Sequence, residues 1–282
     1  MGKFLKKMPD KLPENWLIGG MALLLTAVLV ASILLSGASS PEIQQTQAST
    51  QAALPPLREK PYNPWDFYYL GNFLSCLGVY TVPGIDVSCF QEDIRWEEVA
   101  KAGIEFAMVR IGYRGYMEGV LEEDPTQAEN RNGARAAGID VGVYFFSQAV
   151  SVEEAVEEAR FVLHLLDGWE LDLPVVFDWE YISPEARTAN VTPETLNACA
   201  LAFCREIESR GYDAMVYFNP HLAEDYYRLE ELTEYGFWLA HYSDEMTFPY
   251  AVDLWQYTNQ GTVPGIDTPV DVNLAFGSLY EG

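Results

Sequence analysis

Short runs of β-branched and aromatic residues alternate with longer amphipathic runs from Gly84 onward. Eight of the short runs have the length and composition of strands. Strands that alternate with helices predict a parallel sheet built from strand–helix units. The predicted strands cover residues 84–88, 105–113, 140–147, 173–180, 214–220, 236–242, 252–258 and 270–276.

The predicted helices all fall between the first five strands, and the last three strands follow one another more tightly. These helices cover residues 94–103, 128–138, 151–168 and 195–211. A set of eight strands with helices between them is typical of a (β/α) barrel. We therefore predict an α/β fold, an irregular TIM-like barrel over residues 82–282 that is poor in helices in its second half.

The segment before the barrel has a different composition. Residues 16–40 carry no charge, and about 20 apolar helical residues suffice to cross a bilayer. We predict a basic cytoplasmic tail at 1–15, a transmembrane helix at 16–36, a flexible linker at 37–61 and an aromatic lead-in at 62–81. The lysines of the tail place the N-terminus in the cytoplasm and the barrel outside the membrane. A cleaved signal peptide is the alternative, because small residues follow the apolar run, and it would export the barrel too.

The charge of the exported part limits its partners. The chain has 17 basic and 42 acidic residues; without the four lysines and two acids of residues 1–15, 13 and 40 remain, a net charge of −27. Such a surface repels polyanions, so we expect no nucleic-acid partner. The four cysteines and three histidines form no metal-binding motif, and we expect neither a metal nor another cofactor.

Two acids end the fourth predicted strand, at the edge where barrel enzymes carry their catalytic groups. Asp178 and Glu180 are two positions apart. They would therefore share a face with Cα atoms about 6.5–7 Å apart, while Trp179 points the other way. Two carboxylates that close repel each other, so one tends to keep its proton near neutral pH. A proton donor beside an anion is what glycoside cleavage requires.

Further candidate residues lie at the same mouth. Asp86 is near the end of the first strand and Asp271 begins the eighth, although a single strand-end Asp could equally cap a turn or helix. Aromatic rings near acids suit the C–H faces of sugar rings, although each ring taken singly could belong to the core. The predicted substrate-binding residues are Tyr144, Phe146, Tyr217, Trp238, Trp255 and Arg110.

Seven motifs, in their order and spacing, resemble the glycoside hydrolase family 25 muramidases, also called Chalaropsis-type lysozymes. They are GIDVSCFQ (84–91), FAMVRIGYRGY (106–116), VGVYFFSQA (141–149), VVFDWE (175–180), FWLAHY (237–242), DLWQYTNQGTVPGI (253–266) and VDVN (270–273). The resemblance covers about residues 82–280. It implies a flattened, irregular barrel and cleavage of the β-1,4 bond between N-acetylmuramic acid and N-acetylglucosamine in peptidoglycan.

The resemblance also implies roles for the four acids. Glu180 would be the general acid, and Asp178 would position the N-acetyl group of the substrate. Asp86 and Asp271 would line the same pocket as supporting carboxylates. One departure from the family is Phe145, which follows Tyr144 where family members often have His, so a polar contact of that His would be missing.

Two alternatives stay open from the sequence. A chitinase-like family 18 glycosidase often ends its signature in the same D-W-E-Y, but it would need acids where this chain has Leu173 and Val176. A wall-binding module without activity would keep the barrel and the aromatic residues but would not need four acids. For an enzyme, two carboxylates on one wall disfavour direct attack from opposite sides of the bond. We therefore expect the acetamido oxygen of the substrate to attack, with retention of configuration.

Overall fold

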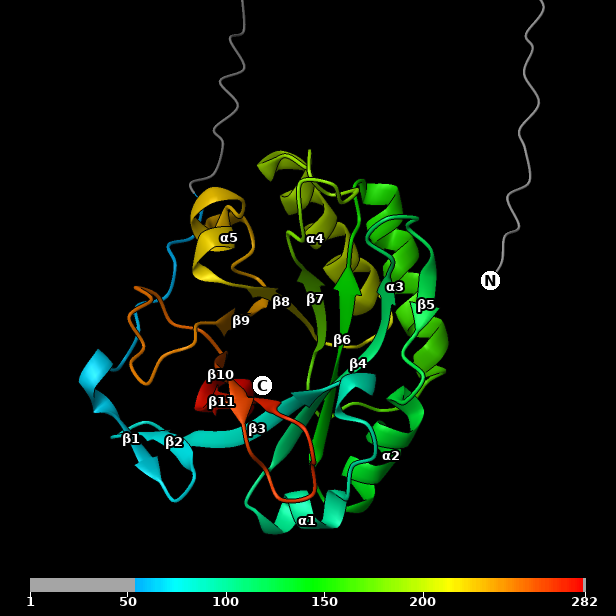
Figure 1. Ribbon diagram of the computed structural model, residues 1–282. Coiled ribbons are helices and arrows are strands. Elements are labelled where there is room, and N and C mark those ends of the chain that lie inside the picture. The colour runs from blue at the N-terminus through cyan, green and yellow to red at the C-terminus, as the bar shows by residue number, and fades with distance from the viewer. Residues whose placement is uncertain (1–53, 281–282) are drawn as a thin grey trace, which may run out of the picture. The chain divides into compact units, whose positions relative to one another are not determined.

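Eight strands close into a barrel in the computed structural model, which describes residues 54–280 (Figure 1). Seven run parallel in the order β3, β4, β6, β7, β8, β9 and β10, and β11 closes the barrel by pairing antiparallel with both β10 and β3. The short β5 extends the sheet beyond β4. Their bounds are β3 (Thr81–Val87), β4 (Phe106–Arg114), β5 (Leu121–Glu123), β6 (Asp140–Ser147), β7 (Val175–Trp179), β8 (Ala214–Phe218), β9 (Gly236–Ala240), β10 (Leu254–Gly261) and β11 (Val270–Phe276).

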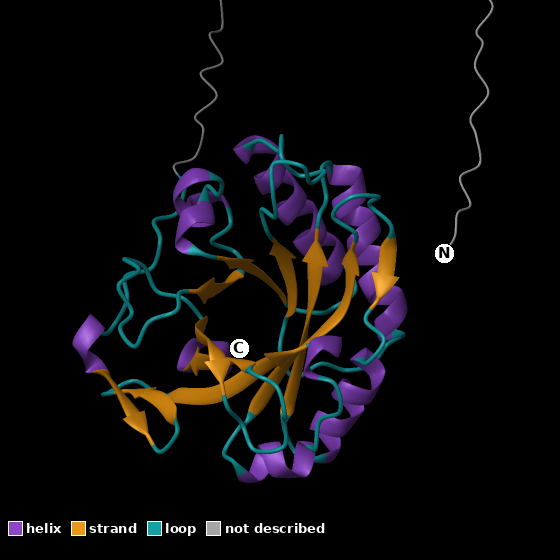
Figure 2. Ribbon diagram, in the orientation of Figure 1, coloured by secondary structure: helices purple, strands orange, loops and turns teal. Residues whose placement is uncertain are grey.

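Four helices lie against the first part of the barrel, three along one side and one at the amino ends of the strands, while a short fifth helix, loops and a hairpin lie toward the other side (Figure 1 and Figure 2). They are α1 (Trp96–Lys101), α2 (Gln127–Ala136), α3 (Val152–Leu166) and α4 (Pro193–Glu208). A fifth helix, α5 (Pro220–Asp225), follows β8. The hydroxyls of Ser151 and Thr192 cap α3 and α4 by accepting hydrogen bonds from backbone N–H groups of their first turns, which fixes where these helices begin.

All eight predicted strands and all four predicted helices correspond to observed elements, so the mixed α/β fold with an eight-stranded barrel is confirmed. The regular repeat of a TIM barrel is not followed at its end, because β11 runs antiparallel. A parallel connection needs a crossover of about a dozen residues or more. Only residues 262–269 join β10 to β11, which is too short for such a crossover.

The inside of the barrel is filled at the amino ends of the parallel strands. Phe106, Met108, Met215 and Leu254 are buried there. A Cβ on Gly84 would lie 2.2 Å from the Phe106 ring, so only glycine allows this ring to enter the barrel. The open end of the barrel is therefore the carboxyl edge of the strands.

The aromatic lead-in forms a β-hairpin of β1 (Phe67–Leu70) and β2 (Phe73–Cys76). Its two-residue turn begins with Gly71 at φ +65°, a conformation that favours glycine. The Phe67 ring packs edge-on against Trp255 of β10, with centroids 5.0 Å apart. The hairpin is thus attached to the outer face of the barrel.

The residues just before the hairpin also contact the barrel. The Arg58 guanidinium pairs with the Asp253 carboxylate at 2.7 Å, and the Lys60 ammonium donates hydrogen bonds to the carbonyls of Met246 and Phe248. Residues 58–60, which the predicted linker at 37–61 included, thus contact the barrel through these charged side chains.

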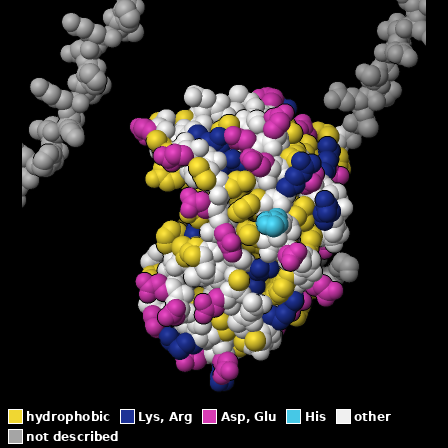
Figure 3. Space-filling model, turned by 90° about the vertical axis from the view of Figure 1, so that its right-hand side faces the viewer, with side chains coloured by type: hydrophobic (Ala, Val, Ile, Leu, Met, Phe, Trp, Pro, Cys, Tyr) yellow, Lys and Arg dark blue, Asp and Glu magenta, His cyan; other side chains and the backbone are white. Residues whose placement is uncertain are grey.

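The predicted cytoplasmic tail and transmembrane helix, and most of the predicted linker, lie outside the described residues. Within residues 54–280, no helix is both long and apolar enough to span a bilayer. Acidic and basic side chains are interspersed on the face drawn in Figure 3, without a continuous basic patch.

Candidate active site

A cavity of about 180 Å³ opens at the carboxyl ends of the parallel strands. Nine of the ten predicted site residues line it, and Trp255 is the exception. The lining residues are Asp86, Arg110, Tyr144, Phe146, Asp178, Glu180, Tyr217, Trp238, Tyr242, Gln256 and Asp271. The topology brings four acids that are spread over almost 190 positions of the sequence to one place.

Asp178 and Glu180 face this cavity together, as their spacing predicts. Asp178 lies in β7, and Glu180 is the first residue after this strand. Trp179 between them is fully buried on the opposite face, where its indole N–H donates to the Ala149 carbonyl at 3.2 Å. This anchor on the outer face fixes which way the two acids point.

Burial shapes the protonation of this pair. Burial and then the neighbouring Glu180 raise the pKa of Asp178 well above its usual value, while the Arg110 charge opposes the rise. Burial also raises the pKa of Glu180, and a hydrogen bond from Tyr217 opposes that rise. Both shifts favour the protonated forms of these two carboxyl groups. A general acid is thereby available beside a second carboxyl group.

One oxygen of Asp178 stands out, because Oδ1 is buried and has no hydrogen-bond partner among residues 54–280. A buried polar atom without a partner costs stability. Asp178 as a residue also lines the cavity, so its carboxyl group is placed to accept a hydrogen bond from a ligand N–H.

A second pair of acids is formed by Asp86 of β3 and Asp271 of β11, which are direct cross-strand partners. Asp86 Oδ2 accepts hydrogen bonds from Gln256 Nε2 at 2.8 Å and Asn273 Nδ2 at 2.7 Å. Burial, followed by the charge of Asp271, raises the pKa of Asp86 to about 8. Burial raises the pKa of Asp271 to about 6. The two amides hold Asp86 in a fixed position.

Arg110 is the one basic residue among those that line the cavity. Its guanidinium is 2.8 Å from the buried Asp124 carboxylate and lies over the rings of Phe90 and Tyr113, 5.0 and 5.3 Å from their centroids. These contacts fix the guanidinium, whose positive charge partly opposes the rise that burial causes in the pKa of Asp178.

Trp255 does not line the cavity, so its prediction as a substrate-binding residue is wrong. It is fully buried on the outer face of β10, where its indole N–H donates to the His241 carbonyl at 2.8 Å. Successive side chains on a strand point to opposite faces, and the adjacent Gln256 takes the inward position. Phe145 likewise faces the outer core, near Phe161, so the departure from the family pattern at this position leaves the cavity wall unchanged.

Sequence reasoning missed Tyr242 and Gln256 on the cavity wall. The Tyr242 hydroxyl donates to Gln256 Oε1 at 3.1 Å. The alternation of a strand could have found both: Tyr242 is four positions after Trp238, and Gln256 is two positions after Leu254, whose side chains point into the barrel. A neutral side chain at a strand end is a weaker signal than an acid, because burying it costs little.

A buried amide supports the backbone of Glu180 from behind. Gln148 is fully buried, and its Nε2 donates to the Glu180 carbonyl at 2.9 Å. The Thr188 hydroxyl donates to Gln148 Oε1 at 3.2 Å, and Arg187 donates to the Gln148 carbonyl at 2.6 Å. The proton donor is therefore held by a chain of hydrogen bonds outside the cavity.

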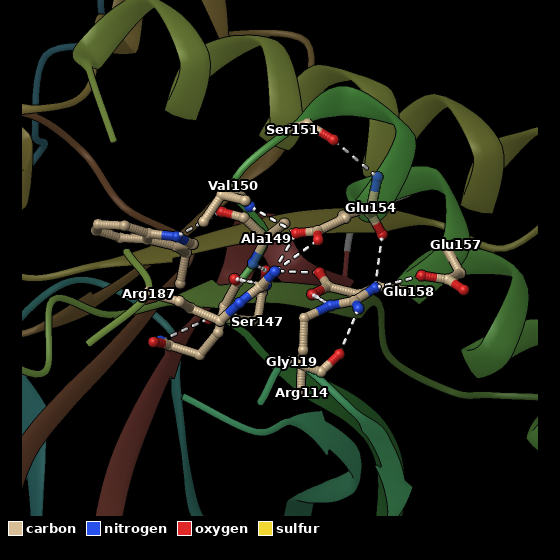
Figure 4. A network of polar contacts seen from close by, with 12 residues as sticks. Arg114, Gly119, Ser147, Ala149, Val150, Ser151, Glu154, Glu157, Glu158 and Arg187 are labelled. Carbon is tan, nitrogen blue, oxygen red and sulfur yellow. Dashed lines mark hydrogen bonds and ion pairs between the residues drawn. The ribbon is translucent and has the colours of Figure 1, made fainter. Parts of the chain in front are cut away.

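Arg187 belongs to a larger polar network between α3 and the strand ends (Figure 4). Its guanidinium forms hydrogen bonds with both carboxylate oxygens of Glu154, at 2.6 and 2.8 Å. Nearby, the Arg114 guanidinium pairs with the fully buried Glu158 carboxylate at 2.7 Å. Glu158 also accepts a hydrogen bond from the Ser147 hydroxyl at 2.6 Å. Burial raises the pKa of Glu158 to about 7. This network ties the end of β6 to α3.

No candidate metal cluster and no disulfide is found among the described residues. Residues 54–280 contain no group of three or more His, Cys, Asp or Glu side chains placed to hold a metal ion. Cys76, Cys89, Cys199 and Cys204 are unpaired thiols. The cavity is lined by carboxyl, amide and aromatic side chains and by the Arg110 guanidinium.

Comparisons with known proteins agree with this geometry. Residues 85–266 match the family described as Glycosyl hydrolases family 25. Lysozyme M1 of Streptomyces globisporus is 26% identical over 284 residues, which cover 88% of this chain and 91% of that protein. The uncharacterized protein YegX of Escherichia coli K12 is 31% identical over 215 residues, 72% of each chain.

Solved structures share the fold. The modular autolysin LytC of Streptococcus pneumoniae, in complex with a synthetic peptidoglycan ligand, superposes with a TM-score of 0.60 at 25% identity. The match covers 69% of this chain and 46% of the autolysin, so this chain spans less than half of that protein. A family 25 glycosyl hydrolase from Bacillus anthracis has a TM-score of 0.60, at 21% identity over 71% of this chain and 91% of its own. With its matching motifs, its barrel and its four acids in one cavity, the chain belongs to glycosyl hydrolase family 25.

Proposed function

We propose that the chain is a muramidase, which cleaves the β-1,4 bond between N-acetylmuramic acid and N-acetylglucosamine of peptidoglycan with retention of configuration. The observation that carries this proposal is the pair Asp178 and Glu180 on one wall of the cavity, with Asp178 Oδ1 unpartnered among the described residues. Membership of family 25 supports it, as does similarity to a lysozyme and to an autolysin solved with a peptidoglycan ligand.

In the first step, Glu180 donates its proton to the oxygen of the scissile bond. Asp178 accepts a hydrogen bond from the acetamido N–H of the substrate and turns the amide carbonyl oxygen toward the anomeric carbon. That oxygen forms a bond to the anomeric carbon while the glycosidic bond breaks, and the electron pair of the broken bond stays with the leaving oxygen. Asp178 then faces the positive charge of the new ring and stabilises it.

In the second step, the Glu180 carboxylate takes a proton from water, and the water oxygen attacks the anomeric carbon. The bond to the amide oxygen breaks, the acetamido group is restored, and two inversions give net retention. A direct attack by Asp178 is disfavoured, because the nucleophile and the acid would have to flank the bond from opposite sides. Asp178 and Glu180 come from the same strand end.

The four acids also favour a catalyst over a passive binding module. Burying carboxyl groups side by side is costly, and binding neutral sugar rings does not need them. A chitinase-like site is disfavoured because the two positions where that signature carries acids hold Leu173 and Val176, which are both buried in the barrel.

The bond specificity is tested by digesting purified peptidoglycan, reducing the products and identifying their ends by mass spectrometry. Reduced muramic acid ends are expected from a muramidase. Reduced glucosamine ends would refute the bond assignment, and the absence of any product would refute the activity.

The role of the acetamido group is tested with peptidoglycan that is de-N-acetylated at muramic acid, against an N-acetylated control from the same preparation. Loss of one ordinary hydrogen bond costs about 1–3 kcal/mol. If the acetamido oxygen is the nucleophile, cleavage should fall by much more than the roughly hundredfold that this cost explains. Fast cleavage of the modified strands, or an inverted anomer in the first product, would exclude this mechanism.

We further propose that the barrel works outside the cytoplasmic membrane, anchored by residues 16–36. The uncharged run and the preceding lysines support this location. Protease added to cells stripped of their wall should then digest the barrel, while the intact chain sediments with membranes. Recovery of a soluble chain that starts near Ala38 would show that the segment is a cleaved signal peptide.

A further inference from the structure

A second cavity, of about 420 Å³, lies beside the catalytic cavity and shares Tyr242 with it. The hairpin β1–β2 forms one wall with Tyr69 and Asn72. The loop after β9 and the ends of β10 and β11 form the others, and they include Asp244, Tyr257 and Gln260. Because Tyr242 belongs to both cavities, a chain that leaves the catalytic cavity on this side meets the second cavity next.

The hairpin wall is held in place by specific contacts. The Tyr69 hydroxyl donates to the Asp244 carboxylate at 2.7 Å, from the hairpin to the loop after β9. The Tyr257 hydroxyl accepts a hydrogen bond from the Leu74 backbone N–H at 3.4 Å. Together with the packing of Phe67 on Trp255, these contacts give the cavity a fixed wall rather than a loose flap.

The lining chemistry indicates the kind of ligand. Three tyrosines are accompanied by hydroxyl and amide side chains, and no Lys or Arg from residues 54–280 lines the cavity. The only charged residue in this lining is Asp244, whose carboxylate already accepts the Tyr69 hydrogen bond. A carboxylate without a basic partner disfavours an anionic ligand such as a peptide with free carboxyl groups. Aromatic faces with neutral hydrogen-bonding groups suit an N-acetylated sugar.

We propose that this cavity is an additional subsite, which binds an N-acetylhexosamine unit of the glycan strand next to the units held in the catalytic cavity. The proposal rests on the proposed function, because it takes the same strand as its ligand. The hairpin at residues 67–76 precedes the region that matches the family, residues 85–266. The subsite is therefore built partly from a segment outside the region that matches the family model.

The test compares variants from two walls of the cavity, Tyr69→Ala and Gln260→Ala, with Tyr68→Ala as the matched control. Tyr68 is exposed and adjacent in the same strand, but it does not line the cavity. The substrates are glycan strands freed of stem peptides and separated by length. For both cavity variants, kcat/KM on long strands should fall about tenfold, which equals about 1.4 kcal/mol, mainly through KM. The loss should shrink on the shortest strands that are still cleaved.

Strand binding to the full-length chain in a Glu180→Gln background separates this proposal from the activity. Titration calorimetry should show about tenfold weaker binding of long peptide-free strands when Tyr69→Ala is added. Equal affinity would overturn the subsite even if the wild-type chain cleaves peptidoglycan normally. A loss seen only with strands that carry stem peptides would overturn it as well, because it would assign the cavity to the peptide.

Discussion

Replacing Gln148 by Leu should lower activity without any contact to the substrate. Gln148 Nε2 donates to the carbonyls of Ser147 and Glu180, both at 2.9 Å, in a fully buried position. Leu removes both donors, and each buried polar group left without a partner costs about 1–3 kcal/mol. We expect the free energy of unfolding to fall by about 2–4 kcal/mol, which lowers the Tm by about 5–15 °C for a domain of this size.

The effect on catalysis follows from the position of Glu180. Once its carbonyl is released, the general acid can shift, and a misplacement of about 1 Å can cost about a hundredfold in rate. We therefore expect kcat to fall by about 10- to 100-fold, with KM changed less than about threefold. Steady-state kinetics on soluble glycan strands, well below the Tm of the variant, would measure both constants.

A matched control is offered by Asn197 on α4, which is also a buried amide with two donated hydrogen bonds and one accepted. It donates to the carbonyls of Pro193 and Tyr226 and accepts from the Arg228 N–H. Asn197→Leu should lower the Tm to a similar extent and keep the wild-type kcat. A wild-type kcat in Gln148→Leu, or an equal loss of kcat in Asn197→Leu, would refute the positioning role.

Three further outcomes follow from the acids of the cavity. Glu180→Gln should reduce kcat by about 10²–10⁴-fold without lowering the Tm, because it removes the proton donor. Asp178→Asn should reduce kcat to a similar extent. Near-wild-type turnover of either variant would contradict the roles of these two acids. Activity should fall as the pH rises and Glu180 loses its proton. Tyr217→Phe should shift this alkaline fall in activity to higher pH, because the hydrogen bond from Tyr217 opposes the rise in the pKa of Glu180. An unchanged pH profile in the variant would argue against that contact. The pKa of Asp86 is raised from 3.8 to about 8, so between about pH 4 and pH 8 the carboxyl group keeps its proton in the folded chain but loses it in the unfolded chain, and the free energy of unfolding falls as the pH rises. Asp86→Asn removes this dependence and should gain at least about 1 kcal/mol relative to wild type at pH 8 compared with pH 5. The same stability difference between variant and wild type at both pH values would count against this prediction.

The sequence predicted the barrel strands because each is a short apolar run bounded by polar turns. The acids were found for a related reason: Asp178 and Glu180 interrupt an apolar pattern at a strand end, where core packing cannot explain them. The direction of β11 was not predicted. It depends on the length of the connection that precedes it and on pairing with β3, almost 190 positions earlier.

The wrong prediction of Trp255 as a substrate-binding residue has a physical cause. Both faces of β10 are buried at Leu254, Trp255, Gln256 and Tyr257, so apolar and polar residues do not alternate cleanly. Without alternation, the sequence does not show which face points inward. The hairpin was not predicted either, because strands with adjacent aromatic residues such as Tyr68 and Tyr69 lack a period of two.

The position of β11 has a consequence for the time at which the enzyme becomes active. This strand lies between β3 and β10 and supplies both Asp271 and the Asn273 amide that holds Asp86. A chain that is still being synthesised has an open sheet until residues 270–276 emerge. Until then, Asp86 lacks its cross-strand partner Asp271 and one of its two hydrogen-bond donors, the Asn273 amide. A hydrolase built in this way completes its active site only when its last strand has been made.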